Sequence, residues 1–276
     1  MSMVELRVWT LLVAGLAYWG NEVRAAGHSG ATGLGYVLEG VFQNGAFAAA
    51  AWVLTALWAT RASPARHASG RQVAASVALG LFAVLPSRQA AILVLLVLGL
   101  QMLGPAGTRT GRKVAVLLLA LALDGAWTSP YVLPLHAAVA DLDARAVQGL
   151  LHLLGIGAAG YGNLVGSADS SGGIEILALC ASSYPFGGVC LAYAVTTLYL
   201  ERFPQRRDLP WLAASLAASV LLTELRLSWM VWREADYTWL HDGGGVTLYT
   251  LVATILAVLF PLLAAHEARP AAYATP

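Results

Sequence analysis

The chain has 276 residues, of which 58% are hydrophobic and only 11% are charged. About a quarter of the residues in a soluble globular domain are charged, so this composition excludes an ordinary soluble domain and, more firmly, a disordered chain. The 16 basic and 15 acidic residues leave a formal charge of +1, which excludes the strong basic field typical of a nucleic-acid-binding protein.

The predicted elements are apolar segments that alternate with short loops holding most of the charges. Five segments are clear, several of them near the ~20 residues that a helix needs to cross a hydrocarbon core. Three are shorter and need local bilayer thinning or arginines that reach the head groups. The segments are Val8–Gly20, Val41–Thr60, Val73–Pro86, Ala90–Gly104, Val114–Trp127, Leu177–Leu200, Trp211–Trp232 and Val246–Ala265. We predict an all-α polytopic membrane protein with about eight transmembrane helices.

The loop charges predict the orientation of this bundle. With the amino terminus inside, eleven basic residues fall in inner loops and five in outer loops. The positive-inside rule then places both termini in the cytoplasm. We expect the first segment to be an uncleaved helix, because Tyr18, Trp19 and Gly20 form a poor cleavage site for a signal peptidase.

The longest outer stretch runs from Thr128 to Ile176. It contains an amphipathic piece, Leu142–Ile156, whose leucines are able to lie on the bilayer surface. A turn rich in glycine and serine, around Gly166–Gly173, closes the stretch. Beyond it no soluble domain is left over, so we predict a single transmembrane domain in contact with the lipid bilayer.

Three polar residues stand out at the outer ends of the last three segments. They are Cys180, Arg226 and His241, and the predicted topology places them in the same depth band. Each can also be explained without a function: the thiol packs as a small hydrophobe, the arginine reaches the head groups, and the histidine is solvated. Together they supply the nucleophile, the acid/base and the anion stabiliser needed for acyl transfer through a thiolate.

Other sites are less well supported by the sequence. The string Gly27–Gly30 matches the G-x-S-G pattern of intramembrane serine proteases, but it lies in a glycine-rich loop instead of a membrane helix. No H-E-x-x-H motif, no Cys/His metal spacing and no phosphate-binding Gly/Lys loop is present. We therefore expect neither a metal nor a cofactor. If Cys180 and Cys190 share one helix, they lie roughly 15 Å apart, too far for a disulfide.

The carboxy-terminal half resembles the exosortase/archaeosortase family of membrane transpeptidases, from about Leu150 to Phe260. The matching features, in order, are the LLxLLG stretch Leu150–Gly155, the turn Gly162 and Asn163, the hydrophobic lead Ile174–Cys180, Arg226, and His241 followed by Gly245. The chain departs from the family pattern in reading Leu-Cys-Ala-Ser at 179–182 instead of Ala-Cys-Ser-Gly, in Pro185, and in Thr223 where the family often has Asn.

The resemblance implies a protein-sorting enzyme of the inner membrane whose active site faces the periplasm or exterior. Such enzymes recognise a C-terminal sorting signal on exported proteins, which consists of a short motif, a membrane helix and a basic tail. They cleave it through a thioacyl intermediate and pass the new carboxyl end to an acceptor. Residues 128–265 would form the catalytic half, residues 1–127 the scaffold helices and residues 266–276 a cytoplasmic tail. The family's catalytic residues correspond to Cys180, Arg226 and His241.

Two other functions stay open. A small transporter or channel would use Arg226 and Glu224 as an intramembrane ion site. These two residues are two positions apart and therefore face different directions on a helix. A non-catalytic assembly factor would depend on small-residue helix faces such as Ala213, Ala217 and Ser219.

Overall fold

The computed structural model describes residues 15, 46–61, 70–83, 85, 87–103, 108–167 and 173–267. These residues belong to two compact units, Met1–Ala126 and Trp127–Pro276. The first expected segment, Val8–Gly20, lies outside the described residues except for Gly15, and so does the string Gly27–Gly30. Nine α-helices occur among the described residues, and the prediction of a mainly helical protein is confirmed.

The first unit contains helices at each of the expected segments that the structure describes. They are α3 (Ala46–Arg61), α4 (Gly70–Ala83), α5 (Arg88–Met102) and α6 (Arg109–Trp127). The Ser87 hydroxyl caps α5 by accepting a hydrogen bond from the Ala90 N–H, as expected for a residue that favours the N-cap position. Lys113, expected in an inner loop, lies inside α6, with its ammonium 4.8 Å from the centre of the Trp58 ring. A cation–π contact accommodates this buried charge.

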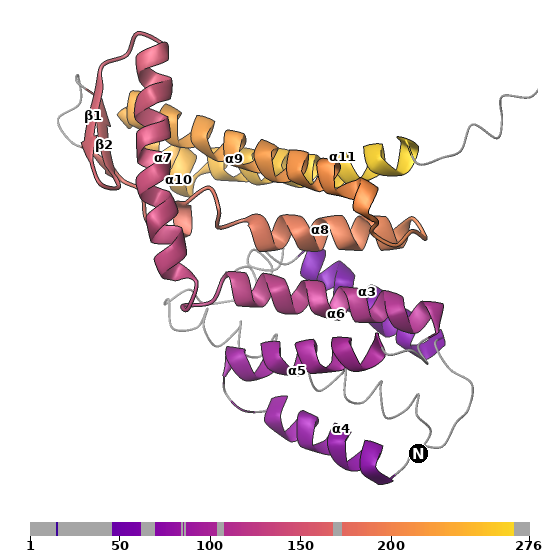
Figure 1. Ribbon diagram of the computed structural model, residues 1–276. Helices are drawn as coiled ribbons and strands as arrows, with labels where there is room; N and C mark the ends of the chain where they lie inside the picture. Colours follow the sequence, from indigo (N-terminus) through magenta and orange to yellow (C-terminus); the bar gives the residue numbers. More distant parts are fainter. Residues whose placement is uncertain are drawn as a thin grey trace, which may run out of the picture. The chain divides into compact units, whose positions relative to one another are not determined.

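The second unit holds the candidate site (Figure 1). Its elements are α7 (Leu133–Leu153), β1 (Ala158–Tyr161), β2 (Leu164–Ser167), β3 (Ile174–Glu175), η1 (Ala178–Cys180), α8 (Phe186–Tyr199), η2 (Arg206–Asp208), α9 (Leu209–Trp232), η3 (Glu234–Asp236), α10 (Tyr237–Asp242) and α11 (Gly244–Glu267). The α7 helix packs on η1 and on α9, and α9 also packs on α8, α10 and α11.

Helix α7 differs from the amphipathic piece expected at Leu142–Ile156. It begins earlier, at Leu133, and it ends in a Schellman motif: the Gly155 N–H bonds to the His152 carbonyl and the Ile156 N–H to the Leu151 carbonyl. Gly155 has φ +75°, a left-handed conformation that glycine adopts without strain. One face of α7 is buried against protein. Its buried residues are His136, Ala140, Asp143, Ala144, Val147 and Leu151.

A small antiparallel sheet, absent from the all-α prediction, follows α7. The order is β1-β2-β3, and Tyr161 pairs with Leu164, so only two residues connect the first two strands. Two-residue hairpin loops favour glycine and asparagine, which here are Gly162 and Asn163. The strands have four, four and two residues, too few for their alternation to be recognised in a hydropathy profile.

The expected helix Leu177–Leu200 is wrong over its first nine positions. The α8 helix begins at Phe186, after Pro185, and the preceding residues form η1 and a series of turns. Proline lacks a backbone N–H and disfavours the helical conformation in the residue before it. Cys180 is therefore not on an α-helix but in η1, in the segment before α8.

Two of the described helices are long and apolar enough to cross a membrane. They are Arg206–Trp232, which comprises η2 and α9, and Gly244–Glu267, which is α11. A row of large apolar side chains on α11 faces outward from the unit: Leu248, Leu251, Ile255, Leu259 and Leu262. An exposed apolar face of this size is typical of a surface that contacts lipid.

Candidate active site

Cys180 is the last residue of η1 and packs against the core of the second unit. Its backbone N–H donates to the Leu177 carbonyl at 2.8 Å. The thiol is partly buried beside a cluster of apolar residues contributed by α7, β1, β2, α9 and α10. Burial raises the pKa of the Cys180 thiol, while the positive charge of Arg226 and a backbone hydrogen bond at Leu177 act in the opposite direction. The thiol therefore needs a base to become a nucleophile near neutral pH.

Asp143 of α7 holds the turn that follows Cys180. Its carboxylate accepts two hydrogen bonds from Ser182, from the N–H to Oδ2 and from the hydroxyl to Oδ1, both at 2.7 Å. Asp143 and Ser182 are 4% and 3% exposed. Because buried hydrogen bonds to a charged group are among the stronger ones, they fix the backbone two residues beyond Cys180.

His136 and Trp127 hold the next residue of the same turn. The Ser183 hydroxyl lies 2.8 Å from His136 Nδ1, and the Trp127 indole N–H donates to the Ser183 carbonyl at 2.8 Å. His136 Nε2 lies 3.0 Å from the Trp127 carbonyl, which can only accept. We infer that Nε2 carries the proton and that Nδ1 accepts from Ser183. This pair has the geometry of a serine activated by histidine, but both residues are buried, so its role is to hold the turn.

Replacing His136 by alanine is expected to lower the free energy of unfolding by about 1–3 kcal/mol, because the buried Ser183 hydroxyl and Trp127 carbonyl lose their partner. Thermal unfolding of the purified protein in detergent measures the effect. His266, exposed in the last turn of α11, is the matched control, and His266→Ala should change stability by no more than about 0.5 kcal/mol. Equal effects of the two substitutions would show that His136 does not support the turn.

Arg226 projects from α9 toward α10 and α11. Its Nε donates to the Leu240 carbonyl at 3.1 Å, and its guanidinium lies 4.7 Å from the centre of the Tyr249 ring. The Tyr249 hydroxyl is in turn 2.9 Å from the Thr223 hydroxyl. No described residue hydrogen-bonds the two terminal nitrogens of Arg226. The side chain is thus held from its Nε edge, and its positive charge acts on the Cys180 thiol.

His241 lies in α10, one residue after the carbonyl that Arg226 binds. Its Nδ1 is 2.8 Å from the Asp242 carboxylate, and its ring stacks on Tyr237 at a centroid distance of 5.0 Å. A carboxylate only accepts hydrogen bonds, so Nδ1 carries a proton and Nε2 keeps a lone pair in the neutral ring. Gly245 lies at a position where a Cβ atom would be 2.8 Å from the Trp239 carbonyl oxygen. A side chain there would push α10 away from α11.

The structure brings Cys180 and Arg226 together and places His241 on the adjoining segment. The carboxyl end of α9 packs on α7, and α10 packs on α9 (Figure 1). Tyr237, on which His241 stacks, packs against the same buried cluster as Cys180. Among the described contacts, no hydrogen bond joins His241 to Cys180 or to Arg226. The predicted common membrane depth of the three residues stays a prediction.

Four supporting residues of this site were not predicted from the sequence: His136, Asp143, Ser183 and Asp242. The first two are seven positions apart on α7 and belong to its buried face. Polar residues at that spacing among alanines and leucines were the available signal, but a polar residue on an amphipathic helix is usually on its solvated side. Asp242 directly follows His241, and its role depends on the rotamer that the ring adopts.

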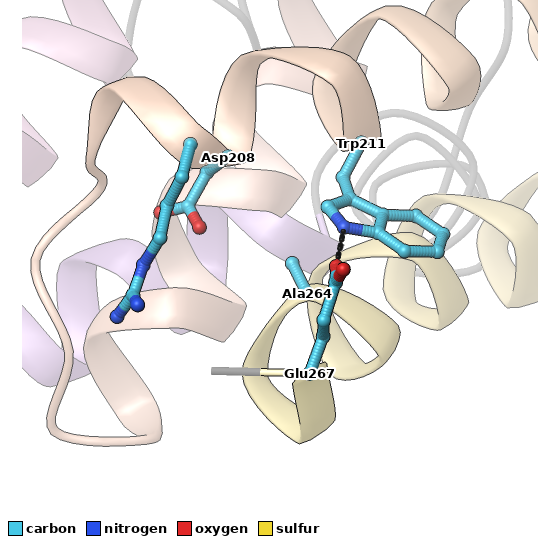
Figure 2. A pocket seen from close by; sticks show the side chains of 5 residues that line it. Asp208, Trp211, Ala264 and Glu267 are labelled. Atoms are coloured by element: carbon cyan, nitrogen blue, oxygen red, sulfur yellow. Dashed lines mark hydrogen bonds between the residues drawn. The ribbon is translucent and has the colours of Figure 1, made fainter. Parts of the chain in front are cut away.

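A cavity of about 250 Å³ lies elsewhere in the unit (Figure 2). It is formed by Arg207, Asp208, Trp211, Ala264 and Glu267, and the Trp211 indole N–H donates to the Glu267 carboxylate at 2.7 Å. Trp211 and Arg226 are separated by roughly 22 Å along α9 at 1.5 Å per residue. The cavity is therefore at the other end of the helix and is not part of the candidate active site.

The chemistry that this arrangement can perform follows from its own geometry. Comparisons with protein-family models, with curated proteins and with solved structures gave no match. The part of the chain that the structure describes contains no group of three or more His, Cys, Asp or Glu side chains suited to a metal ion. A thiol beside a guanidinium, with an imidazole oriented by a carboxylate nearby, is suited to nucleophilic attack on a carbonyl carbon.

Proposed function

We propose that this protein is a membrane-embedded cysteine transpeptidase or protease that cleaves the C-terminal sorting signal of exported proteins. The observation that carries the proposal is the pairing of Cys180 with Arg226, whose terminal nitrogens have no hydrogen-bond partner among the described residues. The guanidinium is held from its Nε edge by the Leu240 carbonyl, and its positive charge lowers the pKa of Cys180.

The reaction would proceed through a thioacyl intermediate. His241 Nε2 accepts the proton of Cys180, and the thiolate attacks the scissile carbonyl of the substrate. Arg226 stabilises the oxyanion that forms, and His241 returns the proton to the leaving amine. An acceptor nucleophile or water then attacks the thioester and restores the thiol. Asp242 keeps the imidazole in the required tautomer through its bond to Nδ1.

The proposal includes the eight-helix topology, with both termini cytoplasmic and the active site at the outer membrane–water interface. Its support is the asymmetry of the loop charges and the outward apolar faces of helices such as α11. A substrate helix lying beside this bundle would bring its outer end to the level of Cys180. The resemblance of residues 150–260 to the exosortase/archaeosortase family points to the same reaction, with residues 1–127 as scaffold helices and residues 266–276 as a cytoplasmic tail.

Labelling of intact cells with a membrane-impermeant maleimide tests the proposed placement of the thiol. The wild type should be labelled, Cys190→Ala should be labelled to the same extent, and Cys180→Ala should not. The physical reason is that Cys180 is only partly buried in a loop before α8, which the proposed topology places outside. The extent of labelling is read from a mass shift of the purified protein.

A wild-type protein that is labelled only after detergent solubilisation would contradict the proposal. Cys180 would then be shielded by lipid or would face the cytoplasm. Labelling that survives in Cys180→Ala would assign the accessible thiol to Cys190, which lies within α8. Either result would contradict an active site with Cys180 at the outer face of the membrane.

A transporter or channel remains a second candidate because Glu224 is a buried acidic residue in α9, one of the helices able to cross a membrane. Intramembrane carboxyl groups often mark ion or proton pathways. The structure directs Arg226 to Leu240 and Tyr249, however, and Glu224 is two positions away and faces a different direction on α9. An ion site made of these two side chains would require both to turn. This candidate predicts that Cys180→Ala keeps function while Glu224→Gln loses it.

A further inference from the structure

The small sheet of the second unit ends in an open edge just before Cys180. The strand order is β1-β2-β3, so β3 pairs on one side only, with β2. Outside the sheet ladder, no hydrogen bond among the described residues uses the main chain of Glu175, one of the two residues of β3. An edge strand with free main-chain groups is a template for pairing with another chain.

The ladder geometry shows which main-chain groups of β3 face this edge. Leu164 pairs with Glu175. In the next pair, the Ile176 N–H donates to the Asn163 carbonyl at 2.8 Å. Pairs of an antiparallel ladder alternate between hydrogen-bonded and non-hydrogen-bonded. The pair of Asn163 and Ile176 is hydrogen-bonded, so the neighbouring pair is not. The N–H and C=O of Glu175 therefore point away from β2, toward the open edge.

The two faces of the sheet differ in what they present beside this edge. One face packs into the core, where Val165 and Ile176 are buried. The other face carries Glu175 and the exposed apolar side chains of Leu164 and Leu177. Leu177 has an extended backbone (φ −73°, ψ 156°) that continues the alternation of β3. An extended peptide laid on the edge would therefore find main-chain partners and an apolar surface for every second side chain.

The open edge lies within reach of the thiol for a short peptide. The two extended steps from Glu175 to Leu177 span about 7 Å at 3.3 Å per residue. The three residues of η1 add about 6 Å at 2.0 Å per residue. The sum, about 13 Å, is the length of about four extended residues. The Cys180 N–H bonds to the Leu177 carbonyl, so the turn of η1 keeps the thiol next to the edge.

We infer that the substrate binds as an added strand on the open edge of β3, with the residues that precede its scissile bond in an extended conformation. The inference rests on the proposed function and adds to it the part of the substrate that is recognised. In the proposed topology the chain runs from β3 through Cys180 into α8, which enters the membrane. The substrate likewise runs from its exported part into its membrane helix. The added strand is therefore parallel to β3, and its main chain supplies the bonds to Glu175.

Disulfide crosslinking tests the position of the substrate without requiring its cleavage. The enzyme background is Cys180→Ala with Cys190→Ala, and either Glu175→Cys or Leu177→Cys is added to it. The reporter ends in a short motif, a membrane helix and a basic tail, and it carries one cysteine at successive positions before the helix. Tyr161→Cys is the control, because Tyr161 is exposed on the same face but is separated from β3 by β2. Products are read as mobility shifts on non-reducing gels.

We expect Glu175→Cys to crosslink strongly at one reporter position and weakly at its two sequence neighbours, whose side chains point to the other face. The best position for Leu177→Cys should lie two residues closer to the membrane helix of the reporter, as a parallel strand requires. Tyr161→Cys should give less than about a tenth of the product, because β2 and β3 lie between its side chain and the edge, about 4.8 Å per strand.

Glu175→Pro in the otherwise native chain tests the main-chain bond itself. Proline removes the Glu175 N–H, which β2 does not use, and proline is tolerated on edge strands. Glu175→Ala is the control, because it keeps the N–H and loses only the carboxylate that accepts from Asn163. Glu175→Pro should lower reporter cleavage by about 5–10-fold, the effect of one lost hydrogen bond, and Glu175→Ala by no more than about twofold. Thermal unfolding of both variants is measured in parallel, and the crosslinking result does not depend on either.

Three results would overturn the inference: crosslinking no stronger than that of Tyr161→Cys, crosslinking of Glu175→Cys to a second copy of the enzyme in place of the reporter, or equal cleavage by folded Glu175→Pro and Glu175→Ala. A shift of the best position away from the membrane helix would overturn the parallel direction. Failure of the proposed function would appear differently, as the expected crosslinks together with no reporter cleavage by the wild type.

Discussion

Replacing Cys180 by alanine is expected to abolish cleavage of a reporter that carries a short motif, a membrane helix and a basic tail at its C-terminus. The thiol is the only group in the proposed site that can form the acyl intermediate. The loss of a covalent nucleophile reduces turnover on the order of 10⁶-fold, because the remaining catalytic groups act only on the nucleophile or on the intermediate that it forms. Cleavage is read as a change in the mobility of the reporter after co-expression, with the amount of enzyme in the membrane measured in parallel.

Cys190→Ala provides the matched control for this experiment. Cys190 is a partly buried thiol on α8, so its replacement should leave cleavage within about twofold while changing the same atoms as the first variant. Cys180→Ser adds a variant of nearly the same shape, which should also be inactive although its turn is retained. Complete reporter processing by Cys180→Ala would exclude a thioacyl mechanism through Cys180.

The apolar segments of the sequence predicted the helices because hydropathy measures the free energy of moving a side chain between water and an apolar environment. Wherever the structure describes an expected segment, a helix is present. The segment Leu177–Leu200 is the exception, because only its later part is helical. Its first nine residues are as apolar as a helix requires, but their backbone groups bond within turns instead. The break is caused by Pro185, a local steric effect that an average over the segment conceals.

The sequence indicated the candidate residues but not the backbone and the side-chain pairs that hold them. It predicted Cys180 on a membrane helix that precedes the helix of Arg226, whereas Cys180 lies in η1, before α8 begins. The role of Asp143 could not be predicted, because its partner Ser182 is 39 positions later in the chain and nothing in the sequence links them. The Leu142–Ile156 piece has the pattern of an interfacial helix, and the sequence did not reveal that one face of α7 packs on η1 and α9.

Replacing Arg226 by lysine is expected to reduce reporter cleavage by ~10²–10³-fold, the usual loss when one stabiliser of an oxyanion is removed. Lysine keeps the positive charge but has no planar fork. The guanidinium uses Nε for the Leu240 carbonyl and lies against the Tyr249 ring, and its terminal nitrogens remain for the substrate. A single ammonium cannot satisfy the carbonyl and the oxyanion in the same geometry. Arg233→Lys, an exposed position in the loop after α9, should have little effect.

The pH dependence of Cys180 alkylation separates the charge of Arg226 from its shape. Arg226 lowers the pKa of Cys180 against the larger effect of burial. Arg226→Gln removes that charge, so the pKa should rise and the alkylation profile should move to higher pH, with slower reaction at any fixed pH below the new value. Arg226→Lys should move the profile less than Arg226→Gln, although its cleavage is reduced. An unchanged profile in Arg226→Gln, or cleavage by Arg226→Lys within about twofold of the wild type, would show that the guanidinium does not act on the thiol or on the oxyanion.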